Sequence, residues 1–149
     1  MEPGRISDFR RINFMLMSIS GLYHEAVVRF GLTDSVAMLL HYLDDHGDRC
    51  PLSSIYKNTG IRKQTLNSSI RKLEADGVLY LEQDTGRSKR VVLTDKGREL
   101  IKNTVGQIRR AEVHSLDDWS QEEIQHYIRL LVRVGASLKR ELDQLDYPD

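Results

Sequence analysis

Two short helical patterns around a glycine turn, followed by two runs of β-forming residues, constrain the fold of this chain most strongly. The helices are expected over roughly 52–58 and 62–75, with Thr59-Gly60 between them. This order is the helix-turn-helix pattern. The runs 78–82 and 90–93 predict a β-hairpin, because turn residues separate them. The centre of the chain is therefore predicted to be a winged helix-turn-helix.

Long one-sided helical patterns flank this centre. Apolar residues recur on one helical face over 6–30, and a capping signal opens a further helix over 34–46. Residues 49–51 are expected to be extended, because a proline follows Cys50. After the hairpin, one helix is expected over about 96–111 and another over 121–145. The fold class predicted is mainly α with a small β-hairpin wing.

The helix expected over 62–75 has two unlike faces. Its apolar residues Leu66, Ile70 and Leu73 fall within about 60° on a helical wheel. The opposite face holds only residues that can donate hydrogen bonds and none that is acidic. They are Lys63, Gln64, Asn67, Ser68 and Arg71. Such side chains suit the phosphates and base edges of a DNA major groove, and Thr65 near the helix start suits a phosphate.

Basic residues also gather near the tip of the hairpin. Arg87, Lys89 and Arg90 lie within four residues, and Gly86 permits a tight turn. A basic wing can reach the DNA backbone or a minor groove. The chain has 22 basic and 22 acidic residues, yet the segment 61–96 carries a net charge of +3. Because binding responds to local potential, we predict double-stranded DNA as a partner.

The apolar faces of the flanking helices are too long to be covered by so small a core. A second copy of the chain is the simplest partner for them. We therefore expect residues 1–31 and 97–149 to form a helical dimerisation region, and residues 32–96 to form the winged helix-turn-helix DNA-binding domain.

Several other classes of protein are disfavoured. One cysteine excludes an internal disulfide and a multi-cysteine zinc site. The sequence has no glycine-rich phosphate loop, Ser-His-Asp signature or HExxH motif, so we expect no enzyme, no metal and no cofactor. It has no run of eighteen apolar residues and no signal-peptide pattern, so we expect a cytoplasmic protein without a membrane partner.

In combination these motifs resemble the MarR family of bacterial transcription regulators. The resemblance covers essentially the whole chain. Its main segments are Leu52-Ser53-Ser54-Ile55, Gly60-Ile61-Arg62-Lys63-Gln64-Thr65-Leu66, Ile70-Arg71-Lys72-Leu73-Glu74-Ala75-Asp76-Gly77 and Val91-Val92-Leu93-Thr94-Asp95-Lys96-Gly97. The resemblance implies a homodimer, joined by its N- and C-terminal helices, that binds a pseudo-palindromic operator. We expect a repressor.

The wing departs from the family pattern. Wings of this family commonly carry an Asp-Arg pair before the returning strand, whereas Gly86-Arg87 takes the nearest place here. We therefore expect that Arg87 lacks the acidic partner that would orient it.

The resemblance also raises release by a small-molecule effector and sensing by cysteine oxidation, and the sequence decides neither. A ligand cleft is expected between the dimerisation helices and the winged lobe, with Tyr23, His24 and His41 as candidate lining residues. Each is more often simply a packed side chain. Cys50 is more often a small buried hydrophobe than a redox sensor. The spacing of His41, His46 and Cys50 matches a metal site only weakly.

Two alternatives stay open. One is a winged-helix protein–protein interaction module without DNA binding. The other is a small-molecule-binding or enzymatic protein that uses the cleft between the lobes.

Overall fold

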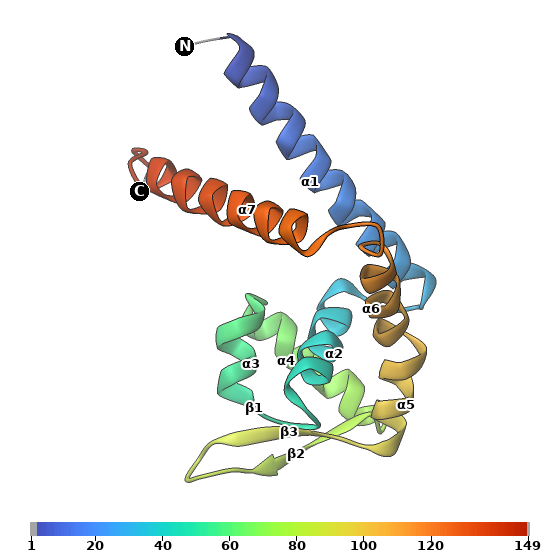
Figure 1. Cartoon of the computed structure of the whole chain (residues 1–149). Coiled ribbons are helices and arrows are strands. Elements are labelled where there is room, and N and C mark those ends of the chain that lie inside the picture. The colour runs from blue at the N-terminus through green and yellow to red at the C-terminus, as the bar shows by residue number, and fades with distance from the viewer. Residues whose placement is uncertain (1–2, 149) are drawn as a thin grey trace. The chain divides into compact units, whose positions relative to one another are not determined.

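The computed structural model describes residues 3–148. The chain forms two compact units, one up to Arg110 and one from Ala111. Figure 1 labels the helices and strands of the described residues. They are α1 Pro3–Arg29, α2 Asp34–His46, β1 Arg49–Pro51, α3 Leu52–Thr59, α4 Lys63–Ala75, β2 Leu79–Gln83, β3 Lys89–Leu93, α5 Asp95–Asn103, α6 Val105–His114 and α7 Gln121–Leu142. The winged helix-turn-helix order predicted from the sequence is confirmed.

Helix α2 is the centre of the core in the first unit. Leu39, Leu40 and Leu43 are fully buried on one of its faces, as their spacing predicts. Thr33 caps the helix, because its Oγ1 accepts a hydrogen bond from the Val36 amide at 3.3 Å. Helices α3, α4 and α5 and the strand β1 pack around α2 (Figure 1). This packing holds α4 in place at the edge of the lobe.

The wing is part of a three-stranded antiparallel sheet rather than a two-stranded hairpin. The strand order is β1-β3-β2, so β3 is central. Cys50 of β1 pairs with Val91 of β3, and Leu81 of β2 pairs with the same residue from the other side. The extended conformation expected for residues 49–51 is confirmed. The sequence did not reveal that this segment pairs with the hairpin, because three residues carry no pairing signal of their own.

The helix expected over 96–111 is broken in two at Thr104. The Thr104 backbone leaves the helical region, with φ −127° and ψ −96°. Its hydroxyl donates a hydrogen bond to the Leu100 carbonyl at 2.7 Å, a local bond that bends helices. Apolar residues on both sides of the break, including Ile101 and Val105, are buried in the same core. Periodicity missed the break because the apolar face continues across it.

Most of the apolar face of α1 is exposed. Only Val27, near the end of the helix, belongs to the buried core. The large apolar residues of the preceding turns lie in solvent within the single chain. They are Ile6, Phe9, Ile12, Phe14, Met15, Leu16, Met17, Ile19 and Leu22. A helix this apolar needs a further surface to cover it.

Helix α7, in the second unit, begins with a capping box. The Ser120 hydroxyl accepts a hydrogen bond from the Glu123 amide at 3.2 Å, and the Glu123 carboxylate accepts one from the Ser120 amide at 2.8 Å. The sequence predicted that this helix ends at Leu145, but in the structure it ends at Leu142. Beyond Leu142 the chain winds more tightly, because the Leu145 amide donates to the Leu142 carbonyl three residues back.

None of the 22 residues of α7, all of which are described, is buried. Its large exposed apolar residues recur at helical spacing. They are Tyr127, Ile128, Leu130, Leu131, Val132, Leu138 and Leu142. An isolated helix gains little stability in water without tertiary packing, so this face also needs a covering surface.

Among residues 3–148, no single helix is long and apolar enough to cross a membrane. The pair Gly4–Arg29 and Asp34–His46 reaches that length and composition only together, across a bend of 92°. Much of the second member of this pair is core helix, since Leu39, Leu40 and Leu43 are buried.

Candidate nucleic-acid interface

Helix α4 presents the face that the sequence singled out. Its apolar residues Leu66, Ile70 and Leu73 are buried and fix it to the lobe. The side that faces away from them is polar, as predicted. Lys63, Gln64, Thr65, Ser68 and Arg71 are exposed, and Asn67 is half-buried. From Lys63 to Arg71 the structure therefore keeps a contiguous, acid-free hydrogen-bonding surface available to a partner. Glu74, near the end of α4, is exposed, and its carboxylate accepts a hydrogen bond from the Leu81 amide at 3.3 Å.

A buried polar contact sets how α4 sits against α2. Ser69 is buried, and its hydroxyl lies 3.0 Å from the hydroxyl of Ser35 in the first turn of α2. A buried polar group stays satisfied only while its partner is in place, so this bond favours one position of α4. The neighbouring Ser68 points outward and donates back to the Gln64 carbonyl at 3.1 Å.

Tyr56 of α3 organises the centre of this surface. Its hydroxyl donates a hydrogen bond to Asn67 Oδ1 at 2.5 Å. Lys63 Nζ lies 5.5 Å from the centre of the same ring, within range of a cation–π contact. With Oδ1 engaged, the amide group of Asn67 is oriented and its NH₂ remains available as a donor. Sequence reasoning missed Tyr56, because it precedes Asn67 by eleven residues on another helix.

The start of α4 offers backbone donors. Within the described residues, no side chain caps this end, and Arg62 occupies the N-cap position. The first amides of a helix have no carbonyl partner within the helix and carry a partial positive charge. Thr65 lies in this first turn and is exposed. A phosphate oxygen suits this end of the helix.

The tip of the wing is a tight turn between β2 and β3. Gly86 has φ +62°, a left-handed conformation that a residue without a side chain adopts readily. The Asp84 amide donates to the Ser88 carbonyl at 2.9 Å and closes the turn. Arg87 and Lys89 are exposed, and among residues 3–148 neither forms an ion pair or a side-chain hydrogen bond. They extend into solvent at the tip, as expected.

Arg90 differs from its two neighbours. It lies in the central strand β3, half-buried, and pairs with Asp84 at 2.7 Å. The wing therefore has an acid–arginine pair, but the paired arginine is Arg90. Among the described residues Arg87 has no acidic partner, as expected. Sequence reasoning overlooked Asp84, which reaches Arg90 across the turn. The Nε atom of Arg90 is buried and has no hydrogen-bond partner among the described residues.

The candidate ligand residues are dispersed. His24 is exposed and its Nδ1 lies 2.9 Å from a carboxylate oxygen of Asp34. His41 is half-buried on α2, and Tyr23 is exposed on α1. None of these three side chains lines the open hollows at the start of α7, along α1, or where α2, β3, α5 and α6 meet. Their role in ligand binding stays a prediction.

Cys50 is a buried thiol in β1. Its Sγ donates a hydrogen bond to the Gly47 carbonyl at 3.3 Å. Burial, and secondarily the negative charge of Asp48, raises the pKa of the Cys50 thiol above its ordinary value. Nearby, the His46 ring stacks on Tyr42, with ring centres 4.0 Å apart, and its Nδ1 bonds the Tyr42 carbonyl. Among residues 3–148, no three His, Cys, Asp or Glu side chains are placed to hold a metal ion.

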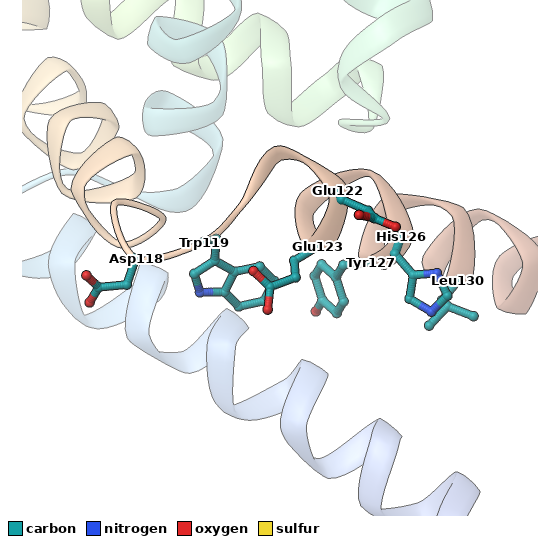
Figure 2. A pocket seen from close by; sticks show the side chains of 7 residues that line it. All are labelled: Asp118, Trp119, Glu122, Glu123, His126, Tyr127 and Leu130. Atoms are coloured by element: carbon teal, nitrogen blue, oxygen red, sulfur yellow. The ribbon is translucent and has the colours of Figure 1, made fainter.

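An open hollow of about 520 Å³ lies at the start of α7 (Figure 2). Its lining is acidic and aromatic. The residues are Asp118, Trp119, Glu122, Glu123, His126, Tyr127 and Leu130. Trp119 and Tyr127 meet edge to face, with ring centres 5.7 Å apart. Such a surface repels a phosphate backbone and suits a basic partner.

A second open hollow, of about 650 Å³, runs along the first half of α1. Its lining combines apolar residues with Arg10 and Arg11. The other residues are Ile6, Ser7, Phe14 and Met15. The charge of this surface is opposite to that at the start of α7.

Comparison with known proteins gives a family match over part of the chain and a fold. Residues 30–90 match the family model described as the MarR family. No curated protein sequence matches the chain. The fold is similar to that of a MarR family transcriptional regulator from Silicibacter pomeroyi, with 23% identity, coverage of 92% of this chain and 96% of that one, and a TM-score of 0.72.

Two further solved structures are similar. A MarR family regulator from Neisseria meningitidis has 12% identity, coverage of 92% of this chain and 97% of that one, and a TM-score of 0.78. BpsR from Bordetella bronchiseptica, whose DNA binding is regulated by 6-hydroxynicotinic acid, has 24% identity, coverage of 79% and 98%, and a TM-score of 0.55. At these identities the structures establish the fold. The match to the MarR family model spans residues 30–90, less than half of the chain, and the chain has the winged helix-turn-helix fold of these MarR family structures.

Proposed function

We propose that this chain is a sequence-specific DNA-binding transcription regulator that works as a homodimer. Solved structures with the same fold are named as transcription regulators, and this supports the proposal. The observation that carries the proposal is the exposed, acid-free face of α4, which buried leucine and isoleucine side chains hold outward. A surface helix without a polyanionic partner ordinarily mixes Glu and Asp into such a face.

In this proposal α4 lies in the major groove. Lys63, Gln64, Asn67, Ser68 and Arg71 meet base edges or phosphates, and Thr65 with the first amides of α4 binds a phosphate. Arg87 and Lys89 meet the backbone or minor groove beside the wing, and Arg90 supports that contact from β3. The pair that Arg90 forms with Asp84 stiffens the base of the turn that carries Arg87.

The proposed dimer uses the helical region 1–31 and 97–149, and the winged domain 32–96 binds DNA. The exposed apolar faces of α1 and α7 support this division. The basic hollow of α1 and the acidic hollow of α7 are complementary in charge, which favours a contact between two copies. A two-fold axis places two recognition helices about one DNA turn apart, so the operator is pseudo-palindromic.

We further propose that the regulator is a repressor released by a small-molecule effector. The regulation of BpsR by 6-hydroxynicotinic acid supports this idea. A transcription assay on a promoter that carries the bound site measures the sign of regulation. Less transcript on addition of the protein supports repression, and more transcript contradicts it.

The main proposal is tested by comparing the affinity of the protein for specific and for random DNA. The specific DNA is a duplex that repeated selection on the wild-type protein enriches from a random library. We expect Arg71→Ala to weaken binding to the enriched duplex by about 1–3 kcal/mol, because a base contact is lost. Binding should also fall steeply with salt, because neutralised phosphates release counterions. Fluorescence anisotropy measures both effects.

Arg133→Ala is the matched control, because Arg133 is an exposed arginine of α7 on the side away from its apolar stripe. It should leave the affinity for DNA unchanged. Equal losses for Arg71→Ala on enriched and random duplexes would show a phosphate contact only. Failure of the wild-type protein to enrich or bind any duplex would favour a protein–protein interaction module.

A further inference from the structure

The break between α5 and α6 changes the hydrogen bonds of two backbone amides. In a continuous α-helix each amide donates to the carbonyl four residues back, so Thr104 would donate to Leu100. The Gln107 amide would donate to the Asn103 carbonyl in the same way. In the structure the Thr104 amide instead donates to the Ile101 carbonyl at 3.2 Å. The Gln107 amide donates to the Thr104 carbonyl at 2.8 Å. Both amides therefore bond three residues back.

The two carbonyls that lose these amides accept hydrogen bonds from side chains. The Thr104 hydroxyl donates to the Leu100 carbonyl at 2.7 Å. The side-chain amide of Gln107 donates to the Asn103 carbonyl at 2.8 Å. Each side chain thus supplies the donor that its own backbone amide supplies in a continuous helix. A bent and a continuous form of this segment therefore satisfy the same two carbonyls, which keeps the difference in hydrogen bonding between them small.

The residues around the break are compatible with both forms. Ile101, Val105 and Ile108 are buried and keep helical spacing across the break. At Gly106 a Cβ atom would lie 3.0 Å from the Ile101 carbonyl oxygen. This close approach belongs to the bent form, because the carbonyl five residues back lies farther away in a continuous helix. Glycine at this position therefore leaves room for the bend.

Ion pairs attach both sides of the break to the end of α2. Before the break, Arg98 pairs with Asp48 at 2.6 Å. After the break, Arg109 pairs with Asp44 at 2.9 Å and also with Asp45. With α5 held by Arg98, straightening of the helix would carry Arg109 away from the carboxylates of α2. The ion pairs of Arg109 therefore favour the bent form.

We propose that residues 104–107 are a conformational switch between a bent and a continuous helix, and that the Thr104 hydroxyl and Arg109 hold it bent. The two forms exchange in the free protein. Helix α6 continues beyond Arg110, where the first unit ends, so the bend sets the direction in which the chain leaves that unit. In the proposed dimer, on which this last consequence rests, that direction sets the spacing of the two α4 helices.

NMR relaxation dispersion on the full chain, without DNA, tests the switch, because it measures the fraction and the chemical shifts of a minor form. We expect a minor form with helical Cα shifts at residues 103–105. Thr104→Val keeps the shape of the side chain but removes the hydroxyl, so the Leu100 carbonyl loses its partner in the bent form only. The ratio of continuous to bent helix should rise by about two- to tenfold.

Arg109→Gln should raise the same ratio by about two- to fivefold, because the ion pairs that oppose straightening are lost. Arg109 is half-exposed, so this variant tests the proposal even where Thr104→Val unfolds the lobe. Arg110→Gln is the matched control. Arg110 is the adjacent exposed arginine, and among residues 3–148 its side chain has no hydrogen bond or ion pair. The control should leave the ratio unchanged.

The proposal is overturned if neither the wild type nor the two variants show a minor form. It is also overturned if the shifts of the minor form at residues 103–105 are not helical, or if Arg110→Gln has the same effect as Arg109→Gln. Because the samples contain no DNA, failure of the switch is separate from any failure of the proposed DNA binding.

Discussion

At the scale of single residues, the proposed DNA-reading surface depends on a side chain that is not part of α4. Asn67 is the one half-buried member of the predicted recognition face, and Tyr56 holds its carbonyl oxygen. The sequence identified Asn67 because helical periodicity places it on the polar face. It did not identify Tyr56, since the contact depends on how α3 packs against α4.

Removing this hydrogen bond should reduce specificity more than affinity for DNA in general. Tyr56→Phe keeps the ring near Lys63 but frees Asn67 Oδ1, so the amide group becomes mobile. We expect binding to the enriched duplex to weaken by about 0.5–1.5 kcal/mol, and binding to random duplexes to change little. Fluorescence anisotropy with both duplexes measures the difference.

Tyr147→Phe is the control for this substitution, because Tyr147 is exposed near the C-terminus and also donates one hydrogen bond, to the Leu142 carbonyl. It should not affect either duplex. Equal weakening on both duplexes by Tyr56→Phe would mean that Asn67 does not read a base.

A second residue-scale prediction concerns Gly97, where α5 passes the backbone at Val78. A Cβ atom at this position would collide with the Val78 carbonyl and lie 2.8 Å from Leu93 Cδ2. Gly97→Ala should therefore lower the free energy of unfolding by about 1–3 kcal/mol. Urea-induced unfolding followed by circular dichroism measures the loss.

Gly21→Ala provides the comparison, because nothing described in the chain lies within 4 Å of a Cβ atom there. Gly21 lies within α1, on the side away from its apolar face. This change should raise the free energy of unfolding by about 0.5–1 kcal/mol through better helix propensity. A stable Gly97→Ala protein would show that α5 can shift away from Val78.

At the scale of elements, local signals located most helices and failed where a break or a pairing is tertiary. The Thr33 cap and the apolar face of α2 were visible in the sequence and are confirmed. The break at Thr104 was not, because Leu100, Ile101 and Val105 keep their helical spacing on both sides of it. The pairing of β1 with β3 was invisible for a different reason, namely that register between distant segments depends on the packed core.

The cap of α7 gives a pH-dependent prediction. Hydrogen bonds from Ser120 lower the pKa of Glu123. The bond from the Ser120 amide has the larger effect, and the bond from the Ser120 hydroxyl has the smaller one. This pKa is lower in the folded than in the unfolded chain. The carboxylate therefore makes its full contribution to the free energy of unfolding when the pH is above the unfolded-state pKa. This contribution disappears as pH falls through the folded-state pKa. Wild type should thus be more stable than Glu123→Gln at pH 7, and the difference should vanish in acid.

Thermal unfolding across this pH range measures the effect. Glu122→Gln removes the same charge from the adjacent residue, whose side chain has no hydrogen bond or ion pair among the described residues. It should produce a smaller change. Ser120→Ala should cost about 1 kcal/mol at pH 7, because the cap itself is lost. A pH-independent difference for Glu123→Gln would contradict the role of the carboxylate.

At the scale of the whole molecule, the exposed apolar faces of α1 and α7 require a partner that the single chain does not provide. The sequence predicted this from stripes too long for a small core. The structure agrees in leaving these residues exposed. The proposed homodimer would cover both faces and would also set the spacing of the two proposed recognition helices.

Leu131→Asp should separate the proposed dimer, because it places a charge in the apolar stripe of α7. Sedimentation should then give the mass of one chain, 17.2 kDa, where the wild type gives twice that value. Affinity for the enriched duplex should fall with it. Ala136→Asp adds the same charge on the opposite side of α7 and should leave the dimer intact. A wild-type mass of one chain would refute the proposed dimer.

The sequence by itself determined which faces are apolar, which are polar, and in what order helices and strands follow. These properties depend on residue type and short-range spacing. Helical spacing alone places Leu66, Ile70 and Leu73 on one apolar face of α4, and the structure buries that face. Only the tertiary structure decided that Tyr56 restrains Asn67, that Asp84 pairs with Arg90, and that Arg109 pairs with Asp44. Each of these contacts joins residues whose distance apart is set by packing of the core, and local periodicity contains no information about that packing.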